Sequence, residues 1–149
     1  MQNHSLTQIE NKLIRFMSNS IHHSDRIIKT EQFLQECGGW LRLLDFLKQE
    51  NSYLKTRLSF VVDHKTESDF LALAEQFQNK FILKDEFISE ITHDVKIQEA
   101  LLTEDAVKKI ATEERLIKKQ QKLRNEIEYL EKDFNAAKTE FNKFISSVL

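Results

Sequence analysis

The chain of 149 residues contains no proline, and its only two glycines are adjacent, at Gly38 and Gly39. Glycine and proline most often mark the turns between elements, and sheet proteins require such turns at short, regular intervals. A chain with one glycine pair therefore favours long helices joined by a few short polar turns. The sequence predicts an all-α fold: antiparallel long-helix hairpins forming a three-helix coiled-coil bundle, with a shorter helical N-terminal arm.

Heptad patterns of apolar residues indicate where the long helices lie. We expect helices over about 40–64, 68–102 and 104–148, with Thr66 or Ser68 capping the second and Thr103 capping the third. These helices would form a coiled-coil domain over residues 40–149. In the third helix the apolar pattern changes phase between Ile117 and Ile127, which predicts local overwinding within residues 118–125.

Residues 1–39 are more weakly patterned and are expected to form an arm that can move. Within it, Leu6, Ile9, Leu13 and Phe16 fall on one face at helical spacing, and the polar run 19–24 is expected to interrupt the helix. The glycine pair has two interpretations. It can end a helix in the left-handed conformation, or a helix can pass through it at a cost of about 1 kcal/mol per glycine. We favour the break, which makes Gly38 and Gly39 the expected hinge.

The unequal helix lengths predict self-association. At ~1.5 Å per residue the three expected helices would be about 37, 52 and 67 Å long, so the end of the third would project beyond its neighbours. An apolar tip of this kind is normally covered. The expected interface comprises Phe141, Phe144, Ile145 and Val148. Asn51 joins this set because asparagine at an a position fixes helix register, either between copies or within one chain.

Two further patterns are candidate sites of chemistry. Glu90 and His93 have the Glu-x-x-His spacing that carboxylate-bridged di-metal bundles use twice, and here it occurs once. A metal-binding bundle enzyme is therefore the alternative function. A basic stripe could contact phosphate and offers a second alternative, weak nucleic-acid binding; it comprises Arg115, Lys118, Lys119 and Lys122.

Composition argues against several classes. The net charge of −2 gives no reason to expect strong nucleic-acid binding, and no apolar run approaches the length of a membrane span. The first ten residues do not resemble a secretory signal. Cys37 is alone, so no intrachain disulfide can form, and a cytoplasmic location fits best.

The sequence contains no glycine-rich phosphate loop and no paired-cysteine metal signature, and it predicts no cofactor. We expect a non-enzymatic coiled-coil interaction module, acting as a scaffold, an adaptor or a small helix-binding chaperone. Its expected partners are itself, as a homodimer or higher oligomer, and a second protein that the sequence does not identify.

Overall fold

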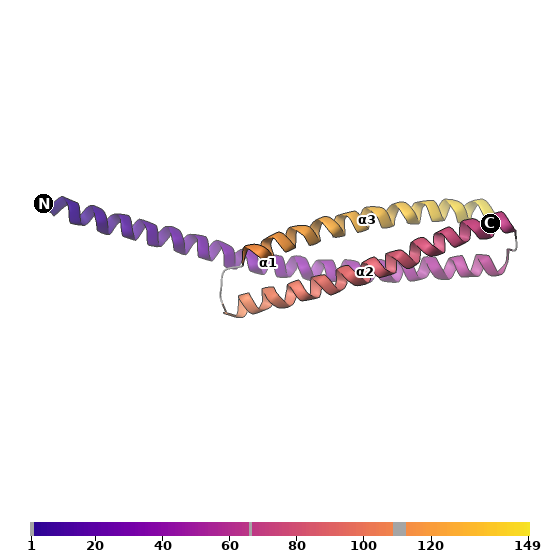
Figure 1. Cartoon of the computed structure of the whole chain (residues 1–149), viewed down its shortest axis with the longest axis horizontal. Coiled ribbons are helices and arrows are strands. Elements are labelled where there is room, and N and C mark those ends of the chain that lie inside the picture. Colours follow the sequence, from indigo (N-terminus) through magenta and orange to yellow (C-terminus); the bar gives the residue numbers. More distant parts are fainter. Residues whose placement is uncertain (1, 66, 109–112) are drawn as a thin grey trace.

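The computed structural model describes residues 2–65, 67–108 and 113–149, and their side chains except those of residues 2–5 and 20–28. These residues form three helices: α1 (Gln2–Asp63), α2 (Ser68–Lys108) and α3 (Glu114–Val148). Figure 1 shows the three helices side by side in an antiparallel bundle, with the first half of α1 extending alone beyond it. The predicted all-α fold and its three-helix bundle are confirmed.

The α2 helix follows its heptad pattern closely. The buried residues recur every three or four positions, which keeps them on one face of a helix. They are Phe70, Ala74, Phe77, Phe81, Lys84, Ile88, Ile91, Val95, Gln98 and Leu102. A seam of this period predicts coiled-coil packing against α1 and α3, and the structure forms it.

The α1 helix runs without interruption through the glycine pair, so the predicted helix break at Gly38–Gly39 is wrong. The predicted interruption at 19–24 is wrong for the same reason, because the backbone of this segment is helical. The seam explains the continuity at the glycines: Phe33, Cys37 and Trp40 are all buried. Their burial offsets the low helix propensity of glycine.

Packing against α2 and α3 therefore begins well before the residue where we expected the bundle to start. Thr30 and Phe33 are already buried, whereas the bundle was expected to begin at Trp40. The glycines lie within this packed segment, between the buried Cys37 and Trp40. That the pair acts as a hinge stays a prediction.

The glycines offer a direct test of the helix that passes through them. A Cβ atom added at Gly38 or Gly39 would meet only the Arg42 guanidinium, at 3.6 and 3.8 Å. Gly38→Ala with Gly39→Ala should therefore stabilise α1, by about 1 kcal/mol per site, and raise the melting temperature measured by circular dichroism. Ala136→Gly, at an exposed helical site in α3, should lower it. A lower melting temperature for the double alanine variant would contradict an unbroken α1.

The connection between α2 and α3 lies later in the chain than predicted. Thr103 does not cap a helix start, because its hydroxyl donates to the Glu99 carbonyl inside α2 at 2.7 Å. The α2 helix continues to Lys108, and α3 begins at Glu114. The seam of α3 then runs from the buried Leu116 through Gln120 to Leu123 in one phase. The predicted phase change within 118–125 is therefore wrong.

This later start removes the predicted overhang of α3. Ten residues correspond to about 15 Å of helix, so α3 ends level with the start of α2. Phe144 stacks on Phe70, near the first turn of α2, with ring centroids 5.3 Å apart. Phe141 contacts Phe77 and Phe81 edge-on, at 5.5 and 5.2 Å. The C-terminal apolar residues thus complete the core of their own chain.

Candidate interaction site

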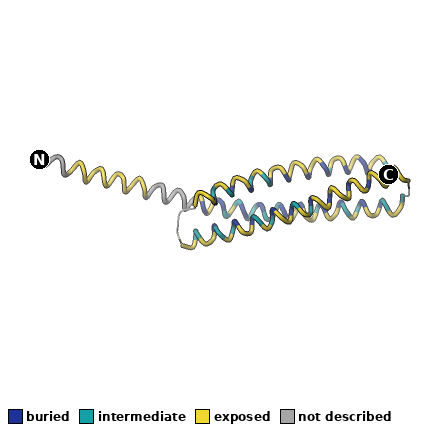
Figure 2. The backbone as a smooth tube through the Cα atoms, in the orientation of Figure 1, coloured by how far each residue is buried: buried dark blue, intermediate teal, exposed yellow. Residues whose placement is uncertain are grey.

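The part of α1 before the bundle carries an apolar stripe on its surface. Leu6, Ile9, Leu13 and Phe16 are between 57% and 69% exposed. Figure 2 shows the exposed turns of this arm extending away from the buried seam of the bundle. Burying one such side chain is worth about 1.5–3 kcal/mol. An apolar stripe on an isolated helix usually marks a contact surface.

The arm leaves the bundle beside a polar cluster, the junction layer, which we define as the buried Cys37, Gln98 and Gln120 with the half-buried Glu36 and Arg124. Gln120 lies at its centre and is fully buried. Its amide nitrogen donates to Glu36 Oε1 at 2.8 Å and to a backbone carbonyl of α1 at 3.2 Å. Its amide oxygen accepts from Gln98 Nε2 at 3.1 Å. One side chain of α3 thereby bonds to both α1 and α2, which fixes their relative register.

The outer edge of the junction layer is an ion pair. Arg124 donates two hydrogen bonds to Glu36, from Nε to Oε2 at 2.9 Å and from Nη2 to Oε1 at 2.6 Å. Burial opposes ionisation of Glu36, but the bonds from Arg124 and Gln120 outweigh it and lower the pKa of this carboxyl group below its usual 4.5. A bidentate ion pair of this kind is stronger and more directional than a pair with a single hydrogen bond. It joins α1 to α3 near the end of the bundle from which the arm extends.

Cys37 is shielded within the junction layer. It is buried, and its thiol donates to Gln120 Oε1 at 3.8 Å. Burial raises the pKa of this thiol to about 11. Because the thiolate is the reactive form, the group is uncharged at neutral pH and unsuited to nucleophilic chemistry.

Asn51 is buried between α1 and α2 of the same chain. Its amide nitrogen donates to the Phe81 carbonyl at 2.8 Å and to Asp85 Oδ1 at 2.6 Å. Lys55 also pairs with Asp85. Asn51 therefore sets the register of α1 against α2 within one chain. A role between copies has no support from its position.

The other residues expected at an oligomer interface are also inside the chain. Phe141, Phe144 and Ile145 are buried, and Val148 packs partly buried against the core. Their expected exposure rested on the overhang of α3, which the structure does not have. Among the C-terminal apolar residues, Leu149 is the exposed one.

Glu90 and His93 are both exposed on α2. Among the described residues, no group of three or more histidine, cysteine, aspartate or glutamate side chains lies close enough to hold a metal ion. The Glu-x-x-His spacing thus occurs without the further carboxylates that a di-metal site requires.

The basic stripe is partly neutralised by nearby carboxylates. Arg115 pairs with Glu113 at 2.7 Å and Lys118 with Glu114 at 3.7 Å. The other two cations also have partners: Lys119 lies 3.8 Å from Asp94, and Lys122 lies 3.7 Å from Glu126. Charges compensated in this way attract a phosphate backbone weakly.

A second exposed apolar row lies on the bundle itself. Phe46, Tyr53 and Phe60 recur every seven residues along α1 and are all more than half exposed. This row adjoins α3, where Glu50 pairs with Lys138 at 2.6 Å. The heptad spacing alone is enough to locate this row, but it cannot show whether α3 covers it.

No described helix combines the length and the apolar character needed to cross a membrane. No family model, curated protein or solved structure matches the chain at a significant level.

Proposed function

We propose that this chain is a non-enzymatic coiled-coil interaction module that self-associates and presents helix faces to other proteins. A scaffold, an adaptor or a small helix-binding chaperone would use such a structure. The observation that carries the proposal is the exposed apolar stripe on the arm. The rigid bundle fixes the start of the arm, and α1 carries the stripe into solvent as a continuous helix.

The physical basis is the marginal stability of a single helix. A helix without tertiary contacts is weakly stable in water unless its apolar face is covered. The apolar face of the arm is bordered by Met17, and apart from Ile14 the rest of the arm's described surface is mostly polar, the pattern of a helix that binds another helix. A second copy of the chain could cover this face, and two-fold homodimers are the commonest soluble oligomers. A cytoplasmic location belongs to the same proposal, since a single cysteine offers no intrachain disulfide.

The arm stripe can be tested by charge substitution. Ile9→Asp with Leu13→Asp would place two carboxylates in the contact surface, where their burial is costly. We expect the wild-type chain to have at least twice its 17.7 kDa monomer mass in light scattering at micromolar concentration. The variant should fall to the monomer mass while the bundle keeps its cooperative thermal unfolding.

The matched control changes the opposite face of the same turn. Asn11→Asp adds a carboxylate at an exposed position about half a turn away from the stripe, and should leave the mass unchanged. A wild-type chain that is monomeric under these conditions would refute self-association.

A further inference from the structure

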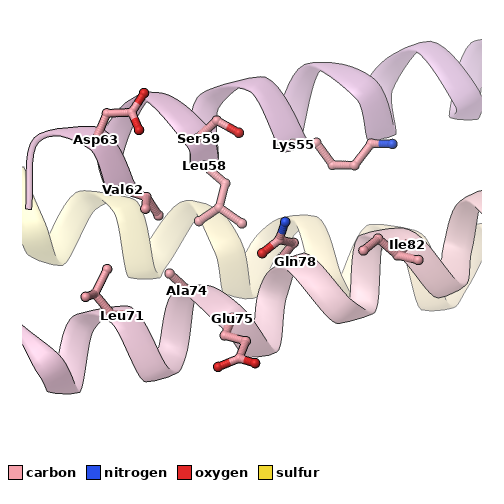
Figure 3. A pocket seen from close by; sticks show the side chains of 10 residues that line it. All are labelled: Lys55, Leu58, Ser59, Val62, Asp63, Leu71, Ala74, Glu75, Gln78 and Ile82. Atoms are coloured by element: carbon pink, nitrogen blue, oxygen red, sulfur yellow. The ribbon is translucent and has the colours of Figure 1, made fainter.

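A groove runs along one side of the bundle between α1 and α2. It consists of two adjoining cavities of about 510 and 740 Å³, which share Lys55 as a lining residue. Figure 3 shows the first of them, with Leu58 and Val62 of α1 facing Leu71 and Ala74 of α2. Leu71 and Ile82 on its α2 side are both exposed. The groove therefore offers apolar surface that none of the three described helices covers.

The shape of the groove suits a helix. Its α1 side is lined at intervals of three or four residues from Leu41 to Val62, a length of about 32 Å. Small side chains at Ser52, Ser59 and Ser89 line its central part, which allows a helix to approach closely. It is the place that a fourth helix would occupy in a four-helix bundle.

The arm of the same chain cannot fill this groove. The α1 helix is continuous from Gln2 to Asp63, so it carries the stripe away from its own bundle. Folding the arm back would require breaking the helix. The arm of a second copy meets no such restriction, and the stripe of about 15 Å from Leu6 to Phe16 fits within the length of the groove.

We propose that the arm stripe of each chain docks in the α1–α2 groove of a second copy, antiparallel to that copy's α1, in a reciprocal dimer. This inference rests on the self-association proposed above and identifies its second surface. An antiparallel arrangement of two α1 helices has two-fold symmetry, so each arm fills the other chain's groove. Such an interface is closed and does not extend into filaments.

The charges beside the stripe favour the antiparallel direction. At 100° per residue, viewed from the arm's N-terminus, Glu10 lies clockwise of the stripe, and Lys12 and Arg15 lie counterclockwise. An arm antiparallel to the partner's α1 turns its basic side towards α2 and Glu10 towards α1. A parallel arm would reverse both contacts.

The α2 wall of the groove is more acidic than the α1 wall, which suits the basic side of an antiparallel arm. The α2 helix carries nine acidic and four basic residues, and its groove-lining charges are Glu75 and Asp85 against Lys96, so this wall is acidic overall. From Trp40 to Asp63, α1 carries four basic and three acidic residues, and its groove-lining charges balance, with Lys48 and Lys55 against Asp45 and Asp63. Exposed pairs of this kind are worth roughly 0–1 kcal/mol each, so they select direction while apolar burial supplies affinity.

The first experiment blocks the groove without touching the arm. Ser52→Arg with Ser59→Arg would place two long charged side chains in the groove, and should reduce the mass in sedimentation equilibrium to that of a monomer. The matched control, Gln49→Arg with Thr56→Arg, makes the same charge change on exposed positions of α1 outside the groove and should keep the dimer. Circular dichroism confirms that both variants remain folded.

The outcomes separate the two proposals. If the groove variant keeps the wild-type mass while Ile9→Asp with Leu13→Asp dissociates, the arm self-associates elsewhere and the groove assignment is wrong. If the wild-type chain is monomeric, both proposals fail. Loss of the dimer in the groove variant together with its retention in the control supports docking in the groove.

The second experiment tests the direction of docking. Isotope-labelled and unlabelled chains are mixed and treated with a carbodiimide, which joins a lysine to a carboxylate in direct contact. We expect intermolecular links from Lys12 to Glu75 or Asp85, on the α2 wall. Links from Lys12 to Asp45 or Asp63, on the α1 wall, would overturn the antiparallel arrangement.

Discussion

Phe81→Ala is expected to lower the free energy of unfolding by about 3–5 kcal/mol, the range for truncating a fully buried phenylalanine. Phe81 is 0% exposed, and its ring meets those of Phe77 and Phe141 with centroids 6.3 and 5.2 Å apart. Truncation removes a ring contact within α2 and one with α3 at once. Tight packing on all sides leaves the neighbours little room to fill the cavity.

Urea titration followed by circular dichroism would measure this loss. Leu83→Ala is the control, because Leu83 lies two residues further along α2 and is 63% exposed. Its truncation should change the free energy of unfolding by about 0.5 kcal/mol or less. Equal effects of the two substitutions would mean that the phenylalanine seam is not the core of the bundle.

Gln120→Ala should cost about 2–4 kcal/mol, from the lost hydrogen bonds and the cavity together. The substitution removes the acceptor of Gln98 Nε2 and the donor to Glu36 Oε1. It also opens a space beside the Cys37 thiol. Two helix contacts therefore weaken at the end of the bundle where the arm begins.

The thiol provides an independent measurement of this change. Cys37 in the wild-type chain should react slowly with iodoacetamide, since it is buried and protonated, and Gln120→Ala should speed the reaction. The adjacent Gln121→Ala is the control, because Gln121 is exposed and bonds to Asn125 and to Arg124 Nη1. Its loss leaves the Nε and Nη2 bonds of Arg124 to Glu36 in place. A variant with unchanged stability and unchanged thiol reactivity would show that the junction layer does not hold the helices together.

The heptad pattern predicted most of the fold because apolar spacing alone determines which helix face is buried. The heptad spacing of α2 coincides with its buried face, which also includes the polar Lys84 and Gln98. The seam of α1 from Trp40 to Val61 is buried as well. For these segments local spacing and tertiary packing agree.

The errors arose where a polar or weak helix former occupies a seam position. Phe33, Cys37 and Trp40 continue the spacing of Leu44, but the glycine pair between them indicated a break. Gln120 continues the spacing between Leu116 and Leu123, but the seam was expected to pass through Ile117, a phase that leaves Gln120 out. The bonds that make Gln120 acceptable come from the other two helices, up to 87 residues away in sequence. Local pattern cannot supply them.

Of the two surfaces of the candidate site, the sequence alone could predict the arm stripe but not the groove. The apolar face of the arm follows from the spacing of Leu6, Ile9, Leu13 and Phe16. The groove depends on which rows of α1 and α2 remain uncovered once α3 is in place, and this requires the assembled bundle. The expected exposure of the C-terminal apolar residues was wrong for a related reason. The turn before α3 was predicted ten residues too early, which displaced the expected end of α3 by about 15 Å.

Because α1 leaves the bundle as an uninterrupted helix, the number of residues between the bundle and the stripe sets the direction in which the stripe faces. Each residue inserted between the bundle and the stripe would advance the stripe by about 1.5 Å and rotate it by about 100°. Insertion of seven residues would nearly restore the facing direction at a greater reach, whereas two would turn the stripe to the opposite side. Evolution or design can thus adjust the reach of this protein in whole heptads, while intermediate lengths change which way it faces.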